Sequence, residues 1–128
     1  MASFMRPFES QAYAAFRIVT GFLFLWHGVQ KLFGFPTGMP ADVPAFIIYV
    51  AGPIELIGGF LVMSGLLTSW AAFLCSGLMA AAYWMAHGLH APLPIQNQGE
   101  LAVVYCFAFL FISARGAGIW SVDGSRAA

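Results

Sequence analysis

The chain has 128 residues, of which 61% are hydrophobic and 8% are charged, against roughly 25% charged in a typical soluble domain. That composition favours a membrane protein. The formal net charge is zero, which gives no indication of nucleic acid or an acidic surface as a partner. The length allows a single domain, which we take to cover residues 1–128.

Four apolar segments follow one another along the chain, at about 11–33, 45–66, 69–88 and 99–115. Each is close to the ~20 residues that a helix needs to cross about 30 Å of hydrocarbon. Proline- and glycine-rich loops separate the first segment from the second and the third from the fourth, and Gly65 begins a tight turn in the middle. The sequence therefore predicts an all-α integral membrane protein, built as a four-transmembrane-helix bundle.

The first segment carries charges in an otherwise apolar stretch. At about 100° per residue, Arg17 and Lys31 fall on one stripe of the helix, with His27 at its edge. An unpaired charge costs about 2.5–3.5 kcal/mol at the centre of a membrane helix, so this stripe should face other helices that supply partners. His27 and Lys31 are four residues apart and should be neighbours, although a lone histidine is more often a packing residue than a ligand.

Glu55 lies about ten residues into the second segment, near the middle of the bilayer. An unpaired carboxylate there would take up a proton or oppose insertion, so we expect it to pair with a cation of the first segment, which the long side chain of Arg17 could supply. Pro53 removes one backbone hydrogen bond beside it. Two interpretations stay open: a structural ion pair that joins two helices, or a polar lining, shared with His27, of a cavity for a ligand or a proton.

The third and fourth segments add polar groups near the same end as Lys31. Tyr83 and His87 are one helical turn apart at the end of the third segment. Asn97 followed three residues later by Glu100 is typical of a capping box at the start of the fourth helix. Glu100 should also lie in the layer of Lys31, where an ion pair would join the fourth segment to the first.

Metal and disulfide chemistry are disfavoured by the spacing of their ligands. The three histidines, His27, His87 and His90, form no HxxxH or HxxEH pattern, so we predict no metal site, while a haem remains an alternative. Cys75 and Cys106 share no CxxC spacing and lie in apolar runs, where a cysteine usually acts as a small hydrophobe.

The basic residues indicate an orientation in the membrane. Arg6, Arg17, Arg115 and Arg126 lie toward the terminal side of the predicted bundle, and only Lys31 lies toward the other side. The positive-inside rule therefore places both termini in the cytoplasm.

Motifs at these polar positions carry a family resemblance over nearly the full length, from about residue 13 to 123. They are Arg17-x3-Gly21, His27-Gly28-x2-Lys31-Leu-Phe-Gly34, Glu55-x2-Gly58-Gly59-x5-Gly65-Leu-Leu-Thr68 and Asn97-x-Gly99-Glu100. In their joint order and spacing the chain resembles the DoxX family of small membrane proteins. The resemblance implies a four-helix bundle in a bacterial inner membrane. It also implies a link to quinone-coupled sulfur oxidation, as in thiosulfate:quinone oxidoreductase, or to membrane oxidoreductase complexes with superoxide dismutase and a sulfurtransferase.

We therefore predict the membrane subunit of a quinone-linked oxidoreductase complex. The chain has no motif for flavin, nicotinamide or iron–sulfur binding, so its electrons should come from a partner subunit, with a quinone as the only cofactor. Two alternatives stay open: a non-catalytic scaffold within a larger complex or homo-oligomer, and transport of protons or a small solute, for which four helices are few. The catalytic residues are unknown, and the polar pocket should be lined by Arg17, His27, Lys31, Glu55, Tyr83, His87 and Glu100.

Overall fold

The computed structural model describes residues 3–127, which form helices and turns without any strand. The four long helices are α1 (Glu9–Phe33), α2 (Gly52–Ser64), α3 (Thr68–Tyr83) and α5 (Glu100–Arg115). A π-helical turn, η2 (Ile47–Ala51), leads into α2, and a second, η3 (Trp84–Gly88), continues α3. The short elements are η1 (Arg6–Phe8), α4 (Pro94–Asn97) and α6 (Val122–Ala127).

Three of the four predicted membrane segments are confirmed as helices that are long and apolar enough to cross a bilayer. They are Arg6–Phe33, Ile47–Ser64 and Thr68–Gly88. The fourth, α5, is apolar but has 16 residues, which makes it about 24 Å long at 1.5 Å per residue. It is therefore shorter than the ~30 Å hydrocarbon thickness that a span must cross.

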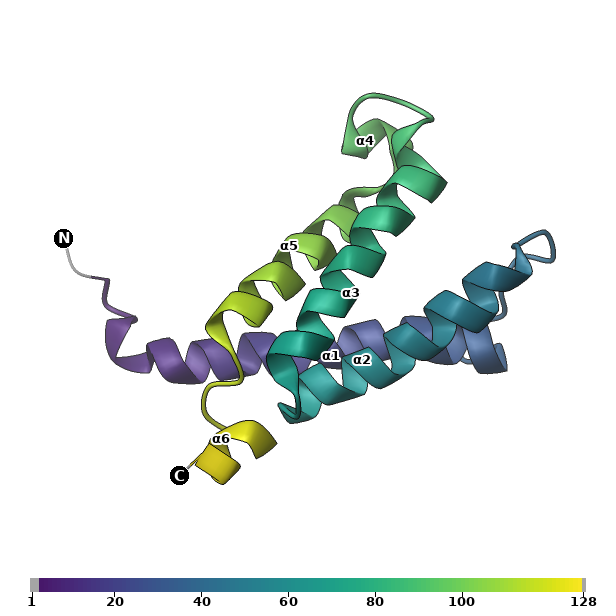
Figure 1. The fold of residues 1–128 in the computed structure, drawn as a ribbon. Coiled ribbons are helices and arrows are strands. Elements are labelled where there is room, and N and C mark those ends of the chain that lie inside the picture. The colour runs from purple at the N-terminus through teal and green to yellow at the C-terminus, as the bar shows by residue number, and fades with distance from the viewer. Residues whose placement is uncertain (1–2, 128) are drawn as a thin grey trace.

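The long helices pack as two antiparallel pairs, α1 with α2 and α3 with α5, and the two pairs cross each other (Figure 1). The pairs meet where the short turn joins α2 to α3, and they diverge away from it (Figure 1). Helices α1 and α5 make few contacts with each other. The four long helices thus form two close pairs that cross.

Glycine allows the first pair to pack with its backbones in contact. A Cβ atom on Gly21 would lie 2.6 Å from the carbonyl oxygen of Gly59, and one on Gly28 would lie 2.6 Å from that of Gly52. The same seven-residue spacing on both helices sets the antiparallel register. Small residues at a membrane helix interface permit this approach, and van der Waals packing then stabilises the pair.

Adding a methyl group at this interface should separate the two helices. We expect Gly28→Ala to lower the free energy of unfolding by about 1–3 kcal/mol, because the new Cβ would overlap the backbone of α2. Gly77→Ala on α3 is the matched control, since nothing lies within 4 Å of a Cβ there. Unfolding by SDS titration in mixed micelles measures both. Equal stability of the two variants would contradict the proposed close contact.

The buried core joins the two pairs. Phe24 of α1 and Phe109 and Ile112 of α5 are fully buried, together with Cys75 of α3. Cys75 and Cys106 are both free thiols. The outer faces of the helices are apolar and exposed, as at Phe22, Phe60, Phe73 and Phe107, which suits helices surrounded by lipid.

The C-terminal segment, residues 116–127, folds back over the α2–α3 turn. Asp123 accepts hydrogen bonds from the backbone N–H groups of Leu67 and Thr68, both at 3.0 Å, and from the Thr68 hydroxyl at 2.9 Å. Its own N–H donates to the Gly65 carbonyl at 2.8 Å. Asp123 therefore caps the N-terminus of α3 from a distant part of the sequence.

Because of this cap, the stability of the folded protein should fall at acidic pH. The backbone N–H of Thr68, then that of Leu67 and the Thr68 hydroxyl, hold the pKa of Asp123 below its usual value. A lowered pKa in the folded state gives stability that is complete above the unfolded value of about 3.9 and is lost as the pH falls through the folded value. We expect Asp123→Asn to abolish this loss of stability at acidic pH. The same substitution should cost ~1 kcal/mol of stability at neutral pH. Thermal unfolding from pH 7 to pH 2 tests this, and Asp42→Asn in an exposed loop is the control. A loss of stability at acidic pH that is unchanged in Asp123→Asn would contradict it.

Candidate functional site

A cavity of about 430 Å³ lies between the two helix pairs, on the side where they diverge from the α2–α3 turn. Its volume is within the range of small-molecule sites. The polar side chains that line it are His27, Lys31, Glu55, His87 and Gln98. Its apolar wall includes Phe24, Ala51, Leu78, Met79, Ala82, Met85, Leu101, Ala102 and Tyr105.

The charged end of the cavity is an ion pair between the first two helices. Lys31 Nζ lies 2.8 Å from Glu55 Oε2, and the two side chains are 13% and 5% exposed. The predicted pairing of Glu55 with a cation of the first helix is therefore confirmed for Lys31. Within residues 3–127 no other group hydrogen-bonds to this carboxylate oxygen, so its charge depends on a single ammonium.

His27 lies beside the ion pair, at the edge of an aromatic group. Its ring meets that of Tyr105 edge to face, with 5.8 Å between centroids, and the ring of Phe24 at 6.5 Å. Phe24 and Tyr105 are themselves in contact, at 5.0 Å. The cavity thus has an aromatic wall next to an imidazole and an ammonium.

His87 reaches the cavity from η3. Its Nδ1 lies 3.0 Å from the carbonyl oxygen of Asn97, and because a carbonyl can only accept, Nδ1 carries the proton. In the neutral ring Nε2 is then a free acceptor. The amide of Asn97 donates to the Tyr83 hydroxyl at 3.0 Å and to the Ala91 carbonyl at 3.1 Å. Tyr83 therefore holds the loop in place and does not line the cavity.

Both π-helical turns contribute to this cavity. Ile47 and Ala51 of η2 line it on one side, and Met85 and His87 of η3 line it on the other. Pro53 is the second residue after η2, and its missing N–H leaves the preceding turn without a regular hydrogen bond. Such π-turns occur frequently at functional sites because they widen the helix and redirect side chains.

Arg17 does not pair with Glu55. Its fully buried guanidinium instead donates to four carbonyl oxygens: Val62 at 2.9 Å and Met63 at 2.8 Å from Nη1, and Ile119 at 3.2 Å and Trp120 at 2.7 Å from Nη2. The helix register places Arg17 beside the end of α2, about two turns from Glu55. There Gly65, at a φ of +73°, ends the helix, and its N–H donates to the Val62 carbonyl at 3.2 Å. The guanidinium adds a donor to that carbonyl and to the one of Met63 at this helix end.

Glu100 also departs from the prediction. It is exposed and forms no ion pair with Lys31, because α5 packs mainly on α3 and begins at the end where the two helix pairs diverge. The expected capping box is absent as well. Asn97 ends α4, and its side-chain oxygen accepts from the Gly99 N–H at 2.9 Å, while Gly99 caps α5 without a side-chain hydrogen bond.

The structure thus brings together four of the seven predicted pocket residues. His27, Lys31, Glu55 and His87 line the cavity, whereas Arg17, Tyr83 and Glu100 do not. Sequence reasoning missed the cavity residues Gln98 and Tyr105, of which Tyr105 could have been found. The signal that could have found it is the spacing of Tyr105, Phe109 and Ile112 at i, i+4 and i+7, which marks the buried face of α5.

The histidine and carboxylate groups do not form a metal site in the part of the chain that the structure describes. There, no three His, Cys, Asp or Glu side chains lie close enough together to hold an ion. The chemistry of the cavity is therefore that of an ion pair, two imidazoles and a phenol, which can donate and accept hydrogen bonds and move protons.

Comparison with known proteins gives a family for this chain. The family model described as DoxX matches residues 12–88. A protein of Haemophilus influenzae named "Uncharacterized protein" is 39% identical over 116 residues, covering 86% of this chain and 87% of that protein. "Putative oxidoreductase CatD" of Bacillus subtilis is 41% identical over 56 residues, which are 41% of this chain and 42% of CatD. No solved structure matches the chain. With a family match over more than half of its length and a relative of this similarity, the chain belongs to the DoxX family of membrane proteins.

Proposed function

We propose that this protein is the membrane subunit of a quinone-linked oxidoreductase complex and that the quinone binds in the cavity between the two helix pairs. The single observation that carries the proposal is the lining of that cavity: His27 and the Lys31–Glu55 ion pair stand beside an aromatic wall. A quinone needs donors at its two oxygens and an apolar slot for its ring, and this arrangement offers both.

The proton chemistry of a quinone suits these groups. Conversion to the quinol takes up two electrons and two protons, so the site must deliver protons to the ring oxygens. Lys31, His27 and the Tyr105 hydroxyl are the donors of the cavity, and Phe24 would pack against the ring. The electrons would come from a partner subunit. The name of the relative "Putative oxidoreductase CatD" supports the link to oxidoreductase chemistry.

The proposed topology has four crossings, with both termini in the cytoplasm of a bacterial inner membrane. Arg6 lies near the N-terminus, and Arg115 and Arg126 lie near the C-terminus. The positive-inside rule assigns the side of the membrane that holds these residues to the cytoplasm. Helix α5 packs along α3, so the two would cross together. The short length of α5 can be accommodated by local thinning of the bilayer.

Quinone binding to the purified protein in nanodiscs tests the proposal. We expect ubiquinone-2 or menaquinone-2 to bind, and His27→Ala to weaken binding about tenfold, the cost of one hydrogen bond to a charged or strongly polar group. His90→Ala, in an exposed loop, is the matched control. Ala82→Phe should fill the cavity and abolish binding, whereas Ala81→Phe, at an exposed neighbouring position, should not. Absence of binding, or binding unaffected by Ala82→Phe, would refute the site.

A scaffold role is the second candidate. A hollow of about 500 Å³ on the outer face of α2 and α3, lined by Ile54, Trp70, Phe73, Leu74, Gly77 and Leu78, is almost wholly apolar and could receive a helix of a partner subunit. Deletion of the protein would then lower the abundance of the partner without changing its turnover per molecule. Loss of turnover at constant abundance would favour the quinone site.

A further inference from the structure

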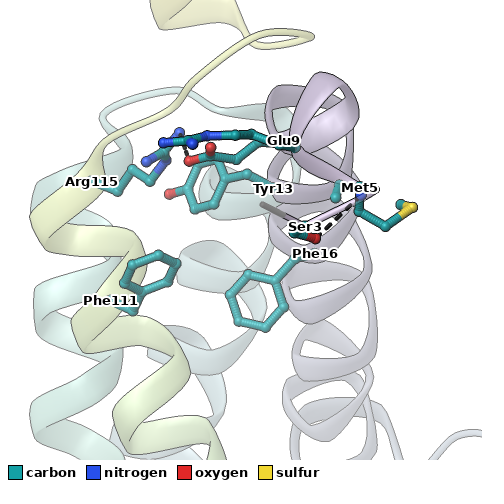
Figure 2. A pocket seen from close by; sticks show the side chains of 9 residues that line it. Ser3, Met5, Glu9, Tyr13, Phe16, Phe111 and Arg115 are labelled. Carbon is teal, nitrogen blue, oxygen red and sulfur yellow. Dashed lines mark hydrogen bonds and ion pairs between the residues drawn. The ribbon is translucent and has the colours of Figure 1, made fainter. Parts of the chain in front are cut away.

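A second hollow lies at the other end of α1 from the cavity. It has a volume of about 550 Å³ and lies between the first turns of α1 and the last turns of α5. Figure 2 shows the charged side chains of Glu9 and Arg115 at one level, and the rings of Phe16 and Phe111 at the next. A polar rim therefore continues directly into an apolar wall.

The rim carries a net positive charge. Arg6 and Arg115 both line it, against the single carboxylate of Glu9. Arg115 lies over the ring of Tyr13, 4.9 Å from its centroid, and its Nη2 is 3.5 Å from Glu9 Oε1. That ion pair is long and open to solvent, with side chains 40% and 62% exposed, so a stronger anion can displace the carboxylate.

The wall below the rim is aromatic and uncovered. Phe16 and Phe111 lie 6.3 Å apart between ring centroids, and both remain exposed. Tyr13 fixes the floor, since its ring meets Phe111 edge to face at 5.7 Å and its hydroxyl donates to the Gly116 carbonyl.

We propose that this hollow binds one anionic phospholipid. Its phosphate contacts the guanidinium of Arg115, with Arg6 as a second cation, and its acyl chain lies along Phe16 and Phe111. A planar guanidinium matches phosphate oxygens in a bidentate contact. The aromatic wall distinguishes a lipid from a free phosphate, because only the lipid has an apolar part to place there.

Native mass spectrometry of the full chain, in detergent with added phosphatidylglycerol or phosphatidylcholine, tests the proposal. We expect retention of phosphatidylglycerol over phosphatidylcholine, and a loss of about fivefold in Arg115→Gln, as for removal of one basic residue at a membrane surface. Glu9→Gln should strengthen retention, because it removes the competing carboxylate. Arg126→Gln, exposed and outside the hollow, is the charge-matched control; an equal loss there would overturn the proposal.

A second pair of variants tests the apolar part. Phe111→Ser should weaken retention of phosphatidylglycerol, whereas Phe107→Ser, one turn away on α5 and exposed but outside the hollow, should not. Inorganic phosphate at the same concentration should not displace the lipid. Displacement by phosphate, or equal effects of the two phenylalanine variants, would show a free-anion site or nonspecific lipid and would overturn the proposal.

Discussion

Replacement of Arg17 by methionine is expected to lower the free energy of unfolding by about 3–5 kcal/mol, one of the two largest effects of any single substitution proposed for this chain. Methionine keeps much of the apolar volume of the side chain but none of its donors. Four carbonyl oxygens, at the end of α2 and in the segment before α6, would lose their hydrogen bonds to the guanidinium. Of the four, the Val62 carbonyl would keep the Gly65 N–H as a donor, at 3.2 Å.

The geometry of the guanidinium makes the effect specific to arginine. Nη1 donates to one pair of carbonyls and Nη2 to another, and a lysine ammonium has no fork that could reach both. We therefore expect Arg17→Lys to recover less than half of the loss. SDS titration in mixed micelles measures the stability, with Arg126→Met at an exposed position as the control.

The same substitution should also release the C-terminal segment. Arg17 joins α1 to Ile119 and Trp120, so its loss should make residues 116–127 accessible to protease in detergent before the helices unfold. Protection of that segment equal to wild type in Arg17→Met, together with unchanged stability, would show that the four hydrogen bonds contribute little.

The sequence predicts much of this fold because hydropathy and helix breakers are local. The apolar runs locate the long helices, and Gly65 marks the end of α2, where its positive φ is observed. The glycines of the first two helices are a further local signal, because small residues permit close packing. How the two pairs would cross does not follow from such local patterns, because the crossing depends on side chains that meet only after folding.

The candidate site shows the same division between local and distant signals. The charge of Glu55 and its position near the middle of a membrane segment correctly indicated that it would pair with a cation on the first helix. Arg17, however, was expected to need a carboxylate, and it bonds carbonyls from two distant segments instead. A sequence does not show which backbone groups will need a side-chain partner. The hydrogen bonds of Arg17 and the cap by Asp123 could therefore not be predicted from residue types alone.

Removing one partner of the Lys31–Glu55 pair is the second substitution with a large expected effect. We expect Lys31→Met to cost about 3–5 kcal/mol, because it leaves a buried carboxylate without its single partner. The double variant Lys31→Met/Glu55→Leu should regain most of that loss, since a buried ion pair replaced by apolar residues is often nearly neutral in stability. The coupling energy from this double-mutant cycle should then exceed about 2 kcal/mol in magnitude, because most of the loss in Lys31→Met is absent from the double variant.

The exposed pair Glu9–Arg115 in the same chain provides the matched control for that cycle. Its atoms are 3.5 Å apart and its side chains are largely open to solvent, so its coupling in lipid-free micelles should lie within about 0–1 kcal/mol. A coupling for Lys31 and Glu55 no larger than this would contradict a strong buried pair. If the apolar double variant is stable and still binds quinone, the ion pair only joins α1 to α2. If it is stable and no longer binds quinone, the charges belong to the binding site, which is the outcome that we expect from their place in the cavity wall.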